Sequence, residues 1–258
     1  MRIATWNVNS LKVRLPQLID WAERRAPDVV CLQETKCEDA NFPLADIRAR
    51  GFETVFSGQK TYNGVAILSR SPAKEVTAGI PGFADEQKRM LAATVDGVRV
   101  VCVYCPNGES VDSPKYAYKL AWYAALREWL LGELQRHPKL VLLGDFNVAP
   151  EDRDVHDPRL WAGKVLFSDP ERAALRALFD LGLHDSFRLF EQPEKSFSWW
   201  DYRMNAFKRN LGLRIDHILV SQPLAIQTRA STIDRDMRGV ERPSDHAPVF
   251  AEIETASA

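Results

Sequence analysis

The sequence lacks a long hydrophobic run, an apolar leader and an excess of charge of one sign. A membrane-spanning helix needs about 18 or more consecutive apolar residues, and none of the apolar runs is that long. Met1 and Arg2 lead directly into a strand-like segment, without the apolar region of a signal peptide. We therefore expect neither a membrane span nor export, and we expect the protein in the cytoplasm.

The charges of the chain nearly cancel. The 34 basic and 35 acidic residues give a formal net charge of −1, which argues against coating of nucleic acid through overall basicity. Any contact with nucleic acid must then be local. One segment, residues 202–215, carries basic residues and no acid, namely Arg203, Lys208, Arg209 and Arg214. On charge alone, such a run is more typical of a solvated surface than of a binding site.

Cysteine is scarce, with four residues in the chain. Cys31 and Cys102 lie inside apolar strand-like runs, where a free thiol behaves as a small hydrophobic side chain. Cys102 and Cys105 have the spacing of a zinc motif, but residues i and i+3 of a strand point to opposite faces. We therefore expect buried, reduced cysteines and no zinc site.

Hydrophobic residues make up 45% of the 258 residues, enough for a large core. Their patterns predict strands at 2–6, 29–32, 52–56, 64–69, 90–95, 98–104, 139–143, 215–220 and 249–253. Helical spacing follows the first strand, at Leu15, Leu18, Ile19 and Ala22, and the Ser-Pro and Asp-Pro pairs at 113–114 and 169–170 open two more helices. No Gly/Ser-rich linker divides the chain. We expect one α/β domain over residues 1–258, with two packed sheets and helices outside.

Polar side chains stand where the expected strands end. The apolar run 140–143 stops at Gly144 and is followed by Asp145 and Asn147. Asn7, Glu34, Tyr104 and Asp216 lie at the ends of other expected strands, and Asp245 and His246 come before a further one. Ligands of α/β proteins usually bind at such strand ends. Carboxylate and amide oxygens without cysteine indicate a hard cation such as Mg²⁺, and a histidine adds proton transfer or phosphate binding. A Ser/His/Asp nucleophilic site is the chemical rival, but the sequence contains no G-x-S-x-G motif.

Seven motifs run through the chain in order, namely TWNVN (5–9), LQETK (32–36), NGVAILSR (63–70), YCPN (104–107), GDFNVAP (144–150), GLRIDHIL (212–219) and SDHAP (244–248). This set resembles the exonuclease III-type apurinic/apyrimidinic endonucleases of the exonuclease–endonuclease–phosphatase superfamily. GDFN and SDHAP also occur in other phosphoesterases of that superfamily. LQETK, YCPN and the aromatic, basic approach to GLRID are more specific and are similar to the bacterial exonuclease III branch.

The resemblance implies a DNase I-like α/β fold, a four-layer sandwich of two packed mixed β-sheets flanked by helices. It also implies hydrolysis of phosphodiesters in double-stranded DNA, dependent on Mg²⁺ or Mn²⁺. The expected substrates are abasic sites and 3′ ends, so the enzyme would be both an abasic-site endonuclease and a 3′–5′ exonuclease in DNA repair, acting as a monomer.

The resemblance assigns roles to residues by position. The catalytic residues it implies are Tyr104, Asp145, Asn147, Asp216 and His246, with Asp145 as the base that activates water. The metal-site residues it implies are Asn7, Glu34, Asp145, Asn147, Asp245 and His246. The substrate-binding residues it implies are Lys36, Asn63, Asn107, Trp199, Arg203, Leu213, Arg214 and Ile215. Of these, Trp199, Leu213 and Ile215 fall where the family lines its pocket for a base-free sugar, and the basic segment is then interpreted as a DNA-backbone contact.

Two residues depart from the family pattern. Ser10 stands where many members have Gly, and Leu213 replaces the Trp of the other main branch, which leaves the balance between abasic-site cleavage and 3′-end trimming open. The alternative function is a phosphoesterase of the same fold that acts on a lipid or a small phosphorylated substrate. A DNA-binding module with an inactive site is disfavoured, because every expected catalytic residue type is present.

Overall fold

In the computed structural model, residues 1–255 are described, and their strands form two six-stranded sheets. The first sheet has the order β11 (Thr228–Ile233), β12 (Val249–Ile253), β1 (Arg2–Asn7), β2 (Val29–Gln33), β4 (Val65–Ser69) and β3 (Glu53–Ser57). The second has the order β5 (Lys74–Ala78), β6 (Met90–Val95), β7 (Val98–Tyr104), β8 (Leu140–Asp145), β10 (Asp216–Ser221) and β9 (Leu183–Asp185). Both sheets are mixed, because β1 pairs parallel with β2 and β7 parallel with β8, whereas the other pairs are antiparallel.

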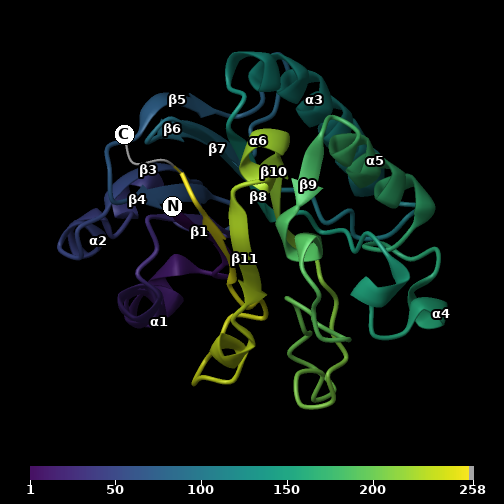
Figure 1. The fold of residues 1–258 in the computed structure, drawn as a ribbon. Coiled ribbons are helices and arrows are strands. Elements are labelled where there is room, and N and C mark those ends of the chain that lie inside the picture. Colours follow the sequence, from purple (N-terminus) through teal and green to yellow (C-terminus); the bar gives the residue numbers. More distant parts are fainter. Residues whose placement is uncertain (256–258) are drawn as a thin grey trace.

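Helices cover the outer faces of the two sheets (Figure 1). The first sheet carries α1 (Leu11–Arg25) and α2 (Leu44–Arg48), and the second carries α3 (Pro114–Arg136) and α5 (Asp169–Phe179). The shorter helical pieces are α4 (Pro158–Trp161), α6 (Gln222–Ala225), η1 (Asp39–Asn41), η2 (Asp152–Asp154), η3 (Ser186–Leu189) and η4 (Arg235–Arg238). The predicted four-layer sandwich of two mixed sheets flanked by helices is therefore confirmed.

The alternation of side chains along the central strands explains the layers. On β2, Val29 and Cys31 face the second sheet, whereas Val30 and Leu32 face α1. A strand with apolar residues on both faces must be covered on both sides, and each fully buried Val or Leu side chain contributes about 1.5–3 kcal/mol. Cys102 likewise faces the core between the sheets, whereas Cys105 faces α3. The prediction that these two thiols point apart is confirmed, and all four cysteines are free.

The predicted strands agree with the observed ones, with ends that differ by up to two residues. The two helix starts at the Ser-Pro and Asp-Pro pairs are confirmed, since Ser113 accepts from the Tyr116 N–H and Ser168 forms a capping box. Three strands were not predicted, namely β5, β9 and β11. Each lies at an edge of its sheet, where one side of the strand is unpaired and the sequence needs no continuous apolar run.

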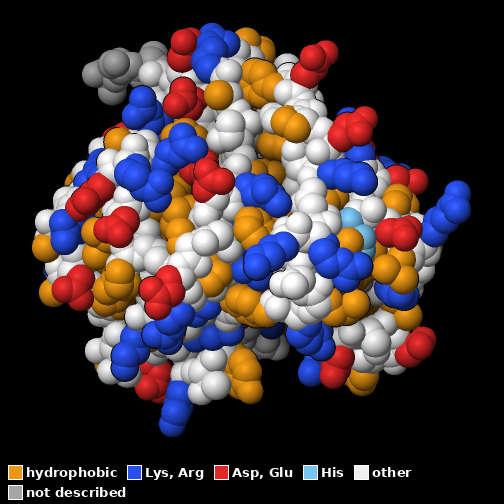
Figure 2. Space-filling model, turned by 90° about the horizontal axis from the view of Figure 1, so that it is seen from below, with side chains coloured by type: hydrophobic (Ala, Val, Ile, Leu, Met, Phe, Trp, Pro, Cys, Tyr) orange, Lys and Arg blue, Asp and Glu red, His pale blue; other side chains and the backbone are white. Residues whose placement is uncertain are grey.

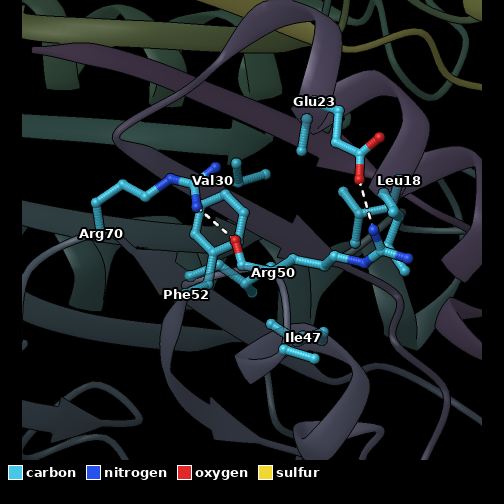
Figure 3. Close-up of a pocket in the computed structure, with 11 residues that line it drawn as sticks. Leu18, Glu23, Val30, Ile47, Arg50, Phe52 and Arg70 are labelled. Atoms are coloured by element: carbon cyan, nitrogen blue, oxygen red, sulfur yellow. Dashed lines mark hydrogen bonds and ion pairs between the residues drawn. The ribbon is translucent and has the colours of Figure 1, made fainter.

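Two further features lie away from the strand ends. A cavity of about 200 Å³ lies among α1, α2 and the first sheet. Its apolar walls include Leu18, Ile47 and Phe52, and its rim includes Glu23 and Arg50 (Figure 3). It shares no residue with the predicted site. Within residues 1–255, no helix has both the length and the hydropathy needed to cross a bilayer.

Candidate active site

The register of the strands brings the polar strand ends together. On the first sheet, Asn7 ends β1 next to Gln33 of β2, so that Glu34 follows beside it. On the second sheet, Asp145 of β8 pairs with both Tyr104 of β7 and Asp216 of β10. β1 contacts β8 and β10 across the core. The polar ends of both sheets thus meet at one end of the sandwich, from which the loops around residues 205 and 240 protrude (Figure 1).

Glu34, Asp145 and His246 form an acidic cluster at this end. Each offers a ligand atom, and these atoms lie within 4.8 Å of one another. Asn7 joins the two carboxylates, because its Nδ2 donates to Glu34 Oε1 at 2.8 Å and to Asp145 Oδ2 at 2.9 Å. The Oδ1 of Asn7 accepts the Asn9 N–H. Asn7 therefore orients the carboxylates through its N–H groups in this structure.

The carboxylate of Asp145 is fully buried. Burial raises the pKa of Asp145 to about 7, and the charges of Asp216 and Glu34 add to this, whereas His246 and the Asn7 hydrogen bond oppose it. A cation beside the cluster would favour the ionised form. This shift in pKa could not be predicted from the sequence, because neither the burial of Asp145 nor its acidic neighbours are visible from its position in the chain.

His246 is held by Asp216. Its Nδ1 lies 2.9 Å from Asp216 Oδ2, and its Nε2 lies 3.7 Å from Asp145 Oδ2. Burial opposes a charge on His246, but the charges of Asp216 and Asp145 outweigh it and raise its pKa to about 10. Ser198 completes the arrangement, because its hydroxyl donates to Asp216 Oδ2 at 2.6 Å. The predicted contact between Asp216 and His246 is confirmed, and the charges of the two aspartates favour the imidazolium form of His246.

Tyr104, Asn107 and Asn147 lie on the second-sheet side of the cluster. Asn107 Nδ2 donates to Asn147 Oδ1 at 3.1 Å, and Asn147 Nδ2 donates to the carbonyl oxygen of Cys105 at 3.0 Å. Burial, together with the charges of Glu34 and Asp145, holds the pKa of Tyr104 well above its ordinary value. Tyr104 is therefore a neutral hydroxyl that can donate a hydrogen bond.

Asp245 stands beside the acidic cluster and not in it. Its Oδ1 accepts from Asn9 Nδ2 and its Oδ2 from Trp199 Nε1, each at 3.0 Å. Lys36 reaches the same region, where its Nζ lies 2.6 Å from Asn9 Oδ1 and 2.8 Å from Glu34 Oε2. In this structure both Asp245 oxygens are thus engaged by protein donors, and Lys36 neutralises part of the charge on Glu34.

Three predicted substrate-binding residues are enclosed in the protein. Leu213 and Ile215 are 0% and 1% exposed in a buried apolar cluster that Trp199 partly covers. Arg214 is 1% exposed, and it pairs with Asp154 at 2.7 Å and Asp185 at 2.8 Å. In this structure Leu213 and Ile215 therefore present no surface to a sugar, and Arg214 presents none to a DNA backbone. Arg214 is a structural cation, because Asp154 and Asp185 neutralise its charge inside the protein.

Other parts of the basic segment are exposed. Arg203, Lys208 and Arg209 lie at the surface, and Arg203 pairs with Asp201. Figure 2 views the molecule from the end where the loops protrude, and Lys and Arg side chains lie there among hydrophobic ones. Asn63 lines a groove of about 770 Å³ that also includes Tyr104 and Asn107. Tyr104 and Asn107 thus line the groove and also border the acidic cluster.

Some of the non-glycine residues with positive φ lie at the same strand ends. Positive φ angles occur at Asn9 (43°), Ser10 (90°), Glu34 (51°), Lys36 (52°) and Asn147 (52°). Residues in such regions cost about 1–3 kcal/mol each and persist only where surrounding structure holds them. The hydrogen bonds of the Ser10 N–H to the Glu34 carbonyl and of the Asn147 N–H to Asp145 Oδ1 provide such support.

Sequence reasoning missed several residues that organise the site. Ser198 holds Asp216, Asn9 holds Asp245, and Lys119 contacts the backbone of Asn107 and Asn147. Asn9 could have been found, because it lies in the same strand end as Asn7. Ser198 and Lys119 could not be recognised from the sequence, since neither lies in one of the seven motifs.

Comparison with known proteins places the site in a family. The model of the Endonuclease/Exonuclease/phosphatase family matches residues 4–246. The chain belongs to this family. It is 38% identical to exodeoxyribonuclease III of Haemophilus influenzae over 266 aligned residues, which cover 98% of this chain and all of the relative.

Solved structures agree with this assignment. The 3′ phosphatase NExo from Neisseria, bound to a product DNA hairpin, is 51% identical with a TM-score of 0.97 and covers 99% of this chain and 100% of that one. An AP endonuclease from Archaeoglobus fulgidus is 38% identical with a TM-score of 0.95 and the same coverage. Within the family, this chain is therefore a phosphodiesterase of the exonuclease III and AP endonuclease type.

Proposed function

We propose that this protein is a divalent-metal-dependent DNA-repair nuclease that hydrolyses phosphodiesters of double-stranded DNA, as a 3′–5′ exonuclease and as an abasic-site endonuclease. The observation that carries the proposal is the cluster of Glu34, Asp145 and His246, in which two carboxylates and an imidazole lie within 4.8 Å of one another and Asp145 and His246 are buried. The relatives named as exodeoxyribonuclease III and AP endonuclease support it over nearly the whole chain.

Mg²⁺ or Mn²⁺ is the ion that we propose for this cluster. The carboxylates of Glu34 and Asp145 share Asn7 as a donor and lie with Asp216 in one buried region, so a cation there would relieve their mutual repulsion. Hard oxygen donors without thiolate fit such an ion. When bound, the ion would stabilise charge on the phosphoryl oxygens and on the leaving alkoxide. Glu34 and Asp145 would hold it, with Asn7 and Asn147 orienting the site and Asp245 beside it.

The residues around the cluster supply the rest of the chemistry. Asp145 would accept the proton of the attacking water as a general base, since its buried carboxylate lies at the centre of the cluster. The His246 imidazolium, held by Asp216, would donate to a phosphoryl oxygen, and Tyr104, Asn107 and Asn147 would donate from the other side. These fixed donors act in a buried site, where each contributes more than it would in water.

The DNA would lie across the end from which the loops protrude. Arg203, Lys208 and Arg209 are exposed there, and the groove that holds Asn63 leads to Tyr104. We propose phosphate contacts for the exposed cations and for Lys36, and a sugar contact for the exposed part of Trp199. We propose that the protein acts as a monomer. The DNA hairpin bound by the Neisseria relative supports the same class of substrate.

The test is Mg²⁺-dependent turnover of the purified protein on four substrates: an abasic duplex, a duplex with a recessed 3′ end, an inositol phosphate and sphingomyelin. We expect hydrolysis of the two DNA substrates. Asp145→Asn should lower it by roughly 10²- to 10⁴-fold, whereas Asp180→Asn, at an exposed acid after α5, should not. Turnover confined to the inositol phosphate or the lipid would replace the proposal with the phosphoesterase alternative.

A further inference from the structure

Lys119 is a buried cation that the chemistry above does not use. It lies on α3, and its Nζ is 2.6 Å from Glu171 Oε2 of α5, with both side chains 0% exposed. Removing two charges from water costs several kcal/mol per ion, and an apolar pair of similar volume is often at least as stable. The Lys119–Glu171 pair therefore calls for an explanation other than stability.

Each donor of the Lys119 ammonium has an acceptor. An ammonium group has three N–H donors, and besides Glu171 the Nζ donates to the carbonyl oxygens of Asn147 at 2.7 Å and Asn107 at 3.1 Å. These two residues lie on separate loops, one after β7 and one after β8. Lys119 thus binds the backbone directly behind two amide side chains that are themselves joined at 3.1 Å.

The surroundings of the pair fix its position. Glu171 Oε1 accepts from both the N–H and the hydroxyl of Ser168 at 2.9 Å, and Ser168 Oγ lies 2.5 Å from the hydroxyl of Tyr116. The aliphatic part of Lys119 packs closely against the loop after β7, since a Cβ atom added to Gly108 would lie 3.2 Å from Lys119 Cδ. Two helices and both loops therefore meet at one ammonium group.

We propose that Lys119 is a positioning residue, which holds Asn107 and Asn147 in the orientation in which their amides bind the reacting phosphoryl group. The proposal rests on the phosphodiesterase function proposed above. A misplacement of about 1 Å can lower a rate by about 10²-fold, and the two carbonyl contacts of Lys119 prevent such a shift in both loops together. Glu171 neutralises the ammonium group and holds it in place.

The experiment compares two double variants that each remove a buried ion pair from α3. Lys119→Met with Glu171→Gln removes the pair without leaving an isolated charge, which Lys119→Met alone would do. Arg99→Met with Glu133→Gln is the matched control, because that pair is also buried, with Nε and Oε2 2.6 Å apart, and lies away from the site. The readouts are melting temperature, kcat and KM on duplex DNA, and hydrogen–deuterium exchange of residues 105–109 and 145–149.

We expect the Lys119 double variant to fold and to lose about 10- to 100-fold in kcat, with KM within about 2-fold and faster exchange in both loops. The control double variant should keep wild-type kcat and wild-type exchange in these loops. Wild-type kcat, or unchanged exchange in both loops, in a folded Lys119 double variant would overturn the proposal. Exchange does not depend on the substrate, so it tests whether Lys119 holds both loops even if the wild type hydrolyses no DNA and the proposed function itself fails.

Discussion

Asp216 Oδ2 accepts a hydrogen bond from His246 Nδ1 at 2.9 Å, so the other ring nitrogen of His246 faces Asp145 across 3.7 Å. Asp216 is on β10 and His246 precedes β12, so this one contact joins the second sheet to the first. It fixes both the orientation and the charge of the imidazole. The residues that depend on it should therefore act as a unit when they are substituted.

Asp216→Asn, His246→Asn and the double variant should lose activity to a similar degree. Each is expected to lose roughly 10²- to 10⁴-fold in rate, because removing either partner disables the same donor. Steady-state kinetics on a DNA substrate measure this, with His137→Asn, at the end of α3, as a control that keeps activity. Losses that multiply in the double variant would show that the two residues act independently.

Glu34→Gln should raise the Mg²⁺ requirement. The amide keeps the shape of the side chain but is a weaker ligand for a hard cation, and it also changes the contacts to Asn7 and Lys36. We expect the Mg²⁺ concentration for half-maximal activity to rise about 10- to 100-fold, the range seen when metal sites are disturbed. Glu23→Gln, at an exposed acid of α1 that pairs with Arg50, is the control. Wild-type activity of Glu34→Gln at low Mg²⁺ would make Glu34 a structural residue.

Arg214→Met should destabilise the fold. It leaves the carboxylates of Asp154 and Asp185 partly unpaired in a buried region, and loss of one partner from a buried ion pair costs about 3–5 kcal/mol. Chemical denaturation measures this loss. Arg203→Gln should leave the denaturation midpoint unchanged, because Arg203 is exposed.

Arg203 and Arg214 also differ in their expected effect on DNA binding. If Arg203 neutralises one phosphate, Arg203→Gln should reduce the slope of log affinity against log salt by about 0.9. A folded Arg214→Gln variant, which also removes a charge, should keep the wild-type slope. A reduced slope in Arg214→Gln would show that Arg214 contacts a DNA phosphate.

Ser10→Gly should stabilise the protein. Ser10 has φ 90° and ψ 103°, and its side chain does not cap α1. The substitution would release about 1–3 kcal/mol of backbone strain. This gain exceeds the cost of about 0.5–1 kcal/mol that arises because glycine loses more conformational entropy on folding. We expect the melting temperature to rise by about 2–4 °C, whereas Ser71→Gly, at a position without positive φ, should not raise it. An unchanged or lower melting temperature for Ser10→Gly would contradict this account.

The sequence predicted the central strands because each is an apolar run long enough to be recognised, as 140–143 is. It did not predict β9 or β11, since three residues such as Leu183–Asp185 and a polar segment such as Thr228–Ile233 become strands only through pairing with a neighbour. The residues of the site that could be predicted are likewise those at the ends of the recognised strands. Asn7, Glu34 and Asp145 could be placed from the strands that they end. The approach of Asn7 to Glu34 followed from the parallel pairing of their strands, whereas Asp145 reaches them from the other sheet.

The burial of charged residues was the hardest feature to predict from the sequence. Arg214 was grouped with exposed neighbours because its acidic partners are Asp154, 60 positions earlier, and Asp185. Lys119 and Glu171 are equally buried and are separated by 52 positions. A charge that is neutralised by distant residues looks like a surface charge in the sequence, and only the packing of the elements distinguishes the two.

The antiparallel pairing of β1 with β12 has a consequence for the synthesis of the protein. β12 follows His246 directly and lies between β1 and β11. A nascent chain therefore carries Asn7 and Glu34 long before His246 leaves the ribosome, and it lacks the strand that brings His246 to them. Chains that are still being translated should be unable to cut DNA, and the hydrolytic activity should arise only once the last strand has been released and has paired with the first.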